Sequence, residues 1–387
     1  MIEEYLGAAR RTKPTTEALV ALYHKYYDHI KGHVSPVGGY PELFVTFSSE
    51  RRCELVKLAD RKYLVYDQCL GQSFNRLNRI QFSTHDSDLL SMAYACKYIA
   101  ERLVTLGAIA PATFFGLISR QFEQNAHASG DPFAINKEDE ALRCQLVAVQ
   151  EMFVMAHELA HHRWALDKVA LNAEMAEYLE DFFKSAGENH NGKESSRSLS
   201  AYYRNILDSG GEELFEEIFA DDFGGLITMR AALAFGVYPW QASLGIILAF
   251  KYLRLFRHLE ILSHKVAALA QSGQSVDFRS DLESVKKEIW DSEVGHIKRF
   301  QLREHFLRYR LRVDRESLPD YALHNESKIV EVVGGYDEKT EFPAVIGLVE
   351  RLADGLTSSI FREIESSIQS AVKGTRVVDE LTGWRRV

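Results

Sequence analysis

The sequence predicts a predominantly α-helical α+β protein, with a small N-terminal β-sheet and additional C-terminal helices. Proline accounts for only 8 of the 387 residues, about 2% against a usual share of about 5%, and this scarcity favours long uninterrupted helices. Runs rich in β-branched and aromatic residues are most frequent in the first third, whereas apolar residues at helical spacing dominate the rest. With 46% hydrophobic residues, the chain can bury a substantial core.

Charge and cysteine usage exclude several classes of protein. The chain has 46 basic and 55 acidic residues, a net charge of −9, which disfavours nucleic acid as a partner. Its 4 cysteines form no CxxC pair, so neither a disulfide scaffold nor a cysteine zinc ribbon is expected. The first residues include acids and no apolar run, and no secretory signal is visible. A reducing, cytoplasmic location is the simplest expectation.

Residues 1–130 are expected to form a mixed α/β part that packs on a helical core. Helical spacing or helix-starting residues favour three helices, at residues 16–30, 88–106 and 113–124. Residues 43–48 and 62–70 have the composition of strands, and residues 74–82 are the candidate for a third. Gly130 and Pro132 indicate a boundary at this point of the chain.

Residues 131–272 are expected to form the helical core, and residues 273–387 a C-terminal helical region. In the core, a long helix over residues 137–166 begins with three acids, which suit the positive end of a helix dipole. The polar residues 185–200 predict a loop or a mobile cover. A second helix is predicted to end near residue 183, and further helices are predicted at residues 212–234, 241–270, 282–312 and 342–372. A short β-like run is predicted at residues 328–333.

One stretch, residues 231–250, carries no charge and is long enough to span a bilayer. Gly236, Pro239 and Gln241 interrupt it, and Tyr238-Pro239-Trp240 has the composition of a turn between two helices. Buried core is therefore the favoured interpretation, and no membrane partner is expected.

The helix over residues 137–166 contains the sequence HELAH, with His157, Glu158 and His161 at its chemical positions. Residues four apart stack on one helical face, so both imidazoles can reach one metal ion. Glu158 lies about 100° round the helix from His157, where its carboxylate could accept a proton from an attacking water. This is the HExxH arrangement of zinc hydrolases. The bland alternative is a pair of ordinary surface or core histidines.

A second segment, EIFAD, supplies the parts that a catalytic zinc site still lacks. Such a site needs a third protein ligand and an open position, and Glu217 is the candidate ligand. Asp221 follows at the same helical offset and is the candidate carboxylate for orienting His157. The neighbouring acids leave two alternatives open, because Glu213 or Glu216 could be the ligand, or the whole run could be a solvated acidic face.

HELAH followed by EIFAD resembles the gluzincin metallopeptidases, whose pattern is HExxH with a downstream ExxAD or ExxSD, as in thermolysin and in the prenyl-protein and heat-shock membrane endopeptidases. The form HELAHH is also similar to IrrE-like regulatory peptidases and to phage-exclusion proteases. The resemblance covers residues 137–234. It implies a zincin-like catalytic core that holds Zn²⁺, with His157, His161 and Glu217 as ligands, Glu158 as general base and Asp221 in support. The multispan membrane architecture and a helix-turn-helix domain, found in some relatives, are not evident.

Hydrolysis also needs a donor aimed at the developing oxyanion. Tyr252, His258 and His264 are the downstream candidates, with His264 the first to test, although an ordinary helical histidine is the commoner interpretation of each.

The predicted function is therefore a soluble zinc-dependent endopeptidase that acts on a protein or peptide substrate. A restricted substrate range, a regulatory or phage-defence role and a regulatory protein partner follow only by analogy with the soluble relatives. The alternative is a regulatory or interaction protein on a gluzincin scaffold, in which the zinc site is structural or silent.

Overall fold

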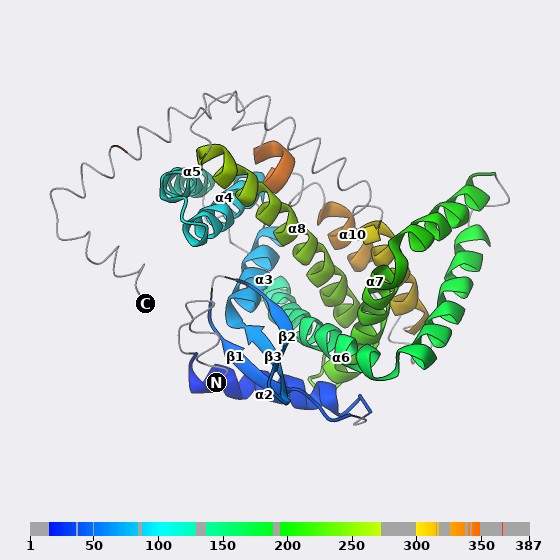
Figure 1. The fold of residues 1–387 in the computed structure, drawn as a ribbon. Helices are drawn as coiled ribbons and strands as arrows, with labels where there is room; N and C mark the ends of the chain where they lie inside the picture. Colours follow the sequence, from blue (N-terminus) through cyan, green and yellow to red (C-terminus); the bar gives the residue numbers. More distant parts are fainter. Residues whose placement is uncertain are drawn as a thin grey trace.

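The computed structural model describes residues 15–35, 38–48, 50–83, 87–128, 137–188, 194–271, 299–314, 326–336 and 343–348, with the single residues 316, 340 and 366. The described chain is predominantly helical and contains one three-stranded sheet (Figure 1). This confirms the predicted α+β class at that coarse level.

The sheet has the order β1-β3-β2, formed by β1 (Glu42–Thr46), β2 (Cys53–Leu58) and β3 (Arg61–Asp67). β1 runs parallel to β3, and β2 runs antiparallel to β3 with Leu55 opposite Leu64. Side chains alternate between the faces of a strand, so Leu64 and Tyr66 enter the main core, whereas Tyr63 and Val65 form a small cluster on the other face. β2 is thus an edge strand of the sheet, and it packs on α6.

Strands were predicted at two of the three correct places. Residues 43–48 and 62–70 coincide largely with β1 and β3, but the third predicted strand, at 74–82, is wrong. These residues belong to helix α3 (Gln68–Gln81), which Asp67 caps by accepting a hydrogen bond from the Cys69 N–H. Leu70, Phe74 and Leu77 recur at three- and four-residue intervals and are buried, which is the periodicity of a helix.

Helices make up the remainder of the N-terminal part. The predicted helix at 16–30 is α2 (Glu17–Lys31), and it contacts β1 and α6. α4 (Ser87–Thr105) and α5 (Ile109–His127) form a packed hairpin at the predicted positions. The predicted boundary at 126–136 lies mostly outside the described residues.

The two longest helices, α6 (Lys137–Glu188) and α7 (Glu194–Leu233), pack side by side. Each is interrupted by one residue with non-helical dihedral angles, Asp167 in α6 and Gly211 in α7. Beyond these residues the helices project from the body of the molecule as a hairpin, here called the arm (residues 168–188 and 194–210; Figure 1). The predicted loop at 185–200 is therefore wrong for 185–188 and 194–200, which are helical, while 189–193 lie outside the described residues.

Helix α8 (Pro239–Gln271) runs from the α6–α7 pair to the α4–α5 hairpin (Figure 1). The uncharged residues 231–250 are the end of α7, a turn and the start of α8, and most of them are buried. No helix in the described part of the chain is long and apolar enough to cross a membrane.

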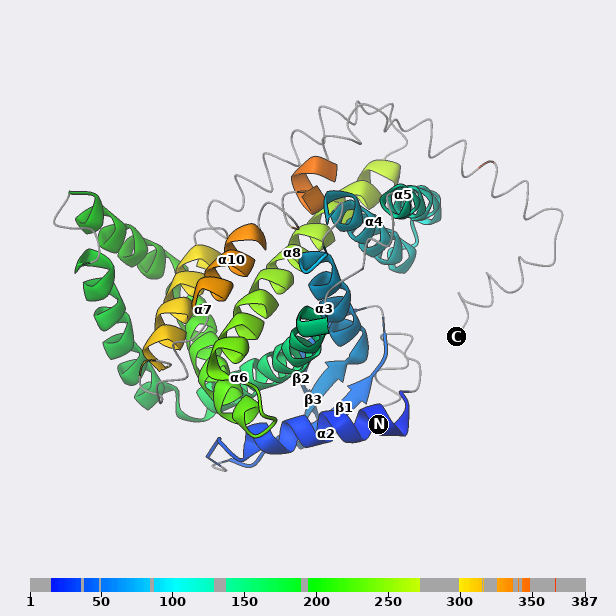
Figure 2. The same ribbon diagram turned by 180° about the vertical axis from the view of Figure 1, so that it is seen from behind.

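In the C-terminal region, residues 299–314 form a helix that lies between the arm and α8 (yellow in Figure 2). Its Leu307 and Leu311 join the main core, whereas Leu302 and Phe306 join the core of the arm. The predicted β-like run at 328–333 is wrong, because these residues lie in helix α10 (Glu326–Tyr336). The predicted helices at 282–312 and 342–372 lie partly outside the described residues, and residues Pro343–Gly347 form one π-helical turn.

Candidate metal centre

The middle of α6 carries the HExxH residues, and the helix brings the two histidines together as their spacing predicts. The Nε2 atoms of His157 and His161 are 3.2 Å apart, and both side chains are only partly exposed. Upstream, Met152, Phe153 and Met155 are buried, which fixes the rotation of α6 about its axis. The polar face of the helix at His157 and His161 is thereby turned towards α7.

α7 supplies the third group. Glu217 Oε2 lies 3.8 Å from His157 Nε2, and its Oε1 lies 3.7 Å from His161 Nε2. One ligand atom from each of the three residues lies within 4.8 Å of the others, and this is the one such group found in the described part of the chain. The predicted ligand set is thus brought to one place, and the neighbouring Glu213 is exposed.

Each histidine also has a carboxylate at its other ring nitrogen. His157 Nδ1 lies 3.1 Å from Asp221 Oδ1, and His161 Nδ1 lies 2.8 Å from Glu216 Oε1. An ionised carboxylate can only accept, so the hydrogen bond to Glu216 assigns the ring proton of His161 to Nδ1, and the nearby Asp221 carboxylate favours the same tautomer of His157. Both Nε2 lone pairs then point at the region that Glu217 also faces, which is the orientation that metal-binding histidines adopt.

The donor atoms suit a tetrahedral divalent ion. Zinc bonds of about 2.0–2.1 Å at tetrahedral angles place two donor atoms about 3.3 Å apart. The nitrogen–nitrogen distance of 3.2 Å matches this spacing, and the two nitrogen–oxygen distances exceed it by a few tenths of an ångström. Two imidazoles and one carboxylate are also a donor set that zinc accepts, with one position left over.

Arg303, from the helix at 299–314, forms ion pairs with two carboxylates of this cluster, those of Glu217 and Asp221. One of its terminal nitrogens lies 2.8 Å from Glu217 Oε2, and its Nε lies 2.7 Å from Asp221 Oδ2. Burial raises the pKa of Asp221, but Arg303 and His157 more than offset this effect, and the pKa lies below its ordinary value. Asp221 therefore stays ionised beside His157.

Glu158 lies beside the ligands on the side of the sheet. The backbone N–H of Leu55 in edge strand β2 is close enough to its carboxylate to lower the pKa of Glu158, although this effect is small. Burial, opposed by His157 and reinforced by Glu217, raises the pKa of Glu158 to about 7. A carboxylate in this environment can take up and release a proton near neutral pH.

None of the three candidates for an oxyanion donor is brought to this cluster. α8 passes the ligands at Ile246, which faces Gly225 beside the His157 turn. His258 and His264 lie roughly 18 and 27 Å further along the helix axis, and the side chain of His264 is exposed. Tyr252 is fully buried and donates to Asn78 Oδ1 at 3.0 Å.

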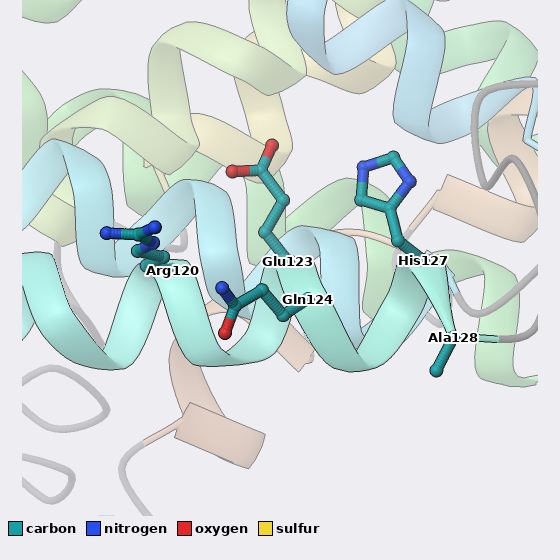
Figure 3. Close-up of a pocket in the computed structure, with 5 residues that line it drawn as sticks. All are labelled: Arg120, Glu123, Gln124, His127 and Ala128. Atoms are coloured by element: carbon teal, nitrogen blue, oxygen red, sulfur yellow. The ribbon is translucent and has the colours of Figure 1, made fainter.

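A separate hollow lies on the surface of α5 (Figure 3). It is lined by Arg120, Glu123, Gln124, His127 and Ala128, all from one helix. Arg76 of α3 forms an ion pair with Glu123 at its edge. The hollow shares no residue with the metal cluster, and we assign no chemistry to it.

Two features of the centre have no signal in the local sequence. Arg303 is separated from Glu217 by most of α7, all of α8 and the segment that follows. Glu216 was an alternative ligand in the sequence, and the structure gives it a different place, at His161 Nδ1.

Comparisons with protein-family models, with curated proteins and with solved structures find no match to this chain.

Proposed function

We propose that this protein is a zinc-dependent endopeptidase built on a zincin-like core. The observation that carries the proposal is the orientation of His157 and His161, whose Nδ1 atoms face carboxylates while their Nε2 atoms face Glu217. The residues present fit zinc in number, chemistry and spacing. Zinc bound there would polarise a peptide carbonyl and lower the pKa of a water molecule.

The proton transfers would belong to Glu158. Its carboxylate accepts a proton as the water oxygen attacks the peptide carbonyl carbon. The same carboxyl group then gives that proton to the leaving nitrogen as the carbon–nitrogen bond breaks. Asp221 holds His157 in the tautomer that presents Nε2, and Glu216 does the same for His161.

A polypeptide substrate is favoured by the neighbouring edge strand. β2 pairs with β3 on one side, and the Leu55 N–H on its other side reaches Glu158. An extended peptide that adds to this edge by backbone hydrogen bonds would bring a peptide bond beside Glu158. A protein or peptide is therefore the substrate class we propose.

Metal content tests the ligand assignment. Purified wild-type protein is expected to carry one equivalent of zinc by inductively coupled plasma mass spectrometry. His157→Ala and Glu217→Ala should lose it, whereas the exposed Glu213→Gln should retain it as a matched control. A Glu217→Ala protein with full zinc content would exclude Glu217 as a ligand.

Glu158→Gln tests catalysis separately from metal binding. The amide preserves shape but cannot accept a proton, so zinc content should be unchanged and turnover should fall by about 10²–10⁴-fold. The measurement compares newly formed protein N-termini in cells that express wild type or Glu158→Gln. Zinc-loaded protein without any wild-type-specific cleavage would favour the alternative function, a regulatory protein with a structural or silent zinc site.

A further inference from the structure

The side chain of Arg303 joins two carboxylates that have different places in the centre. Its guanidinium contacts Glu217 Oε2 at 2.8 Å and both oxygens of Asp221, at 2.7 and 3.0 Å. Glu217 is the candidate third ligand, whereas Asp221 lies behind His157. The rigid guanidinium therefore links the candidate ligand Glu217 to Asp221, the carboxylate that lies behind the candidate ligand His157.

The guanidinium is itself held in place. Its central carbon lies 5.3 Å from the ring centre of Phe250 and 5.2 Å from that of Phe300, so the two rings and the carboxylates restrict its orientation. The guanidinium donates in a planar fork of fixed geometry. Because Asp221 accepts hydrogen bonds from two of its N–H groups, the position of the guanidinium beside Glu217 is determined by the fold.

This contact distinguishes the two oxygens of Glu217. Oε2 lies 2.8 Å from a terminal nitrogen of Arg303 in an ion pair, whereas Oε1 lies 3.7 Å from His161 Nε2. An oxygen that is paired with a cation has less electron density to offer a metal ion, and rotation of the carboxylate towards two-oxygen binding would separate the ion pair.

We propose that Arg303 is a positioning residue that makes Glu217 a one-oxygen ligand, bound through Oε1, and thereby keeps the fourth coordination position open. This role of Arg303 rests on the metal site of the proposed function, and it explains how the metal ion would be kept four-coordinate. Without Arg303, both oxygens of Glu217 become equivalent, and two-oxygen binding fills the position that a water molecule needs.

The test uses Co²⁺ in place of Zn²⁺ in the full-length protein, because the visible absorption of Co²⁺ reports its coordination number. Wild type is expected to give the intense spectrum of four-coordinate Co²⁺, and Arg303→Gln the weaker spectrum of five coordination. Competition with a chelator should also show about 10–100-fold weaker Zn²⁺ binding in Arg303→Gln.

Arg310 provides a matched control on the same helix. It donates to Asp222, the neighbour of Asp221, at 2.8 Å and stacks on Tyr178, and neither of these partners is one of the three candidate ligands. Arg310→Gln thus removes a comparable ion pair between this helix and α7, and its Co²⁺ spectrum should match that of wild type. Arg303→Lys retains the charge if the glutamine variant does not fold, and it should give a spectrum between the two forms.

The outcomes separate this inference from the metal site itself. A four-coordinate spectrum in wild type and in both Arg303 variants would overturn the inference and leave the site standing. An equal change in Arg310→Gln would also overturn it, because the effect would then be one of general packing. If wild type binds no Co²⁺, the metal site fails and the inference fails with it.

Discussion

Glu216 and Glu217 are adjacent in sequence but have different partners in the centre. Glu217 faces the Nε2 atoms of both histidines, whereas Glu216 lies at His161 Nδ1. Successive helical residues point about 100° apart, so the two carboxylates approach the His161 ring from different sides. The same ring can therefore be oriented by one acid and share a metal ion with the next.

Replacing Glu216 by glutamine should weaken metal binding without abolishing it. The amide retains an acceptor for the His161 Nδ1 proton but removes the negative charge that strengthens this contact. We expect about 10-fold weaker Zn²⁺ binding, measured by competition with a chelating dye. Glu213→Gln, a change of an exposed acid on the same helix, should have no effect. Equal affinities of Glu216→Gln and wild type would remove Glu216 from the site.

A second buried acid of α6 lies away from the ligands. Glu151 is only 5% exposed, and Oε1 of its side chain accepts hydrogen bonds from Tyr23 and Tyr66, each at 3.0 Å. Burial raises the pKa of Glu151 to about 7, although the two tyrosine hydrogen bonds act in the opposite direction. The folded state thus binds this proton more tightly than the unfolded chain does.

The stability of the protein should therefore decrease as the pH rises through this range. A pKa that is raised on folding favours the folded state fully below the unfolded value of about 4.5, and this contribution is lost up to about pH 7. Its size is on the order of 3 kcal/mol. In Glu151→Gln this contribution should no longer vary with pH.

Urea unfolding at pH 5, 6, 7 and 8 measures this difference. The free energy of unfolding of wild type, relative to that of Glu151→Gln, should decrease with each step in pH up to about pH 7. Glu140→Gln, at an exposed position of the same helix, should follow the wild-type curve. A difference between wild type and Glu151→Gln that stays constant with pH would show that Glu151 titrates normally.

At the level of residues, helical spacing predicted the pairs His157/His161 and Glu217/Asp221, because partners four apart are set by the geometry of one helix. Arg303 could not be predicted in this way. Its contact with Glu217 depends on the docking of another helix, and no local pattern encodes that distance. The predicted role of His264 rests on its chemistry alone, and the rise of α8 carries this residue roughly 27 Å along the helix axis from Ile246, where α8 passes the ligands.

Among the elements, the approach of α7 to α6 at Gly224 sets the site. A Cβ atom at Gly224 would lie 2.9 Å from the backbone N and 3.0 Å from the Cα of His157. At the neighbouring Gly225, the nearest atom would be the end of the Leu307 side chain, at 3.1 Å. Backbone cannot rotate away as a side chain can, so only Gly224 is strictly required for the close packing of the two helices.

Gly224→Ala should accordingly separate α6 from α7 and widen the ligand cluster. We expect a loss of about 1–3 kcal/mol in the free energy of unfolding, together with weaker Zn²⁺ binding. Gly225→Ala makes the same change in helix propensity and should be close to neutral, because Leu307 can adjust. Chemical denaturation and zinc titration of both variants provide the measurement. Equal stability of the two variants would contradict the role of the close approach.

Helices were predicted correctly from the sequence where their buried residues recur at one regular helical spacing. α6, the second half of α7 and α8 have long apolar stripes and were found close to their observed limits. β2 was missed because it is a partly buried edge strand with little alternation in its side chains. Residues 328–333 contain β-branched residues, yet tertiary packing places Ile329, Val332 and Val333 on the buried face of α10.

In the molecule as a whole, the centre lies where three separate stretches of chain meet. α6 supplies both histidines, α7 supplies Glu217, and the helix at 299–314 supplies Arg303. That helix is also fixed on other sides, because Phe306 packs against Phe182 of the arm and Glu304 forms an ion pair with Lys251 of α8. The predicted border at residue 272 thus separates sequence stretches that share one site and one core, although the division into three parts itself stays a prediction.

Removing the metal should consequently destabilise the whole chain rather than one loop. A ligand that binds only the folded state adds RT ln(1 + [L]/Kd), about 4 kcal/mol at a free concentration 1,000-fold above Kd. Zinc needs α6 and α7 in place, so wild type treated with a chelator should unfold several degrees below the zinc-loaded protein in differential scanning calorimetry. Glu217→Ala should unfold at one temperature with or without zinc, whereas Glu158→Gln should retain the shift. If chelation leaves the unfolding temperature of wild type unchanged, zinc is not bound by a site that depends on the fold.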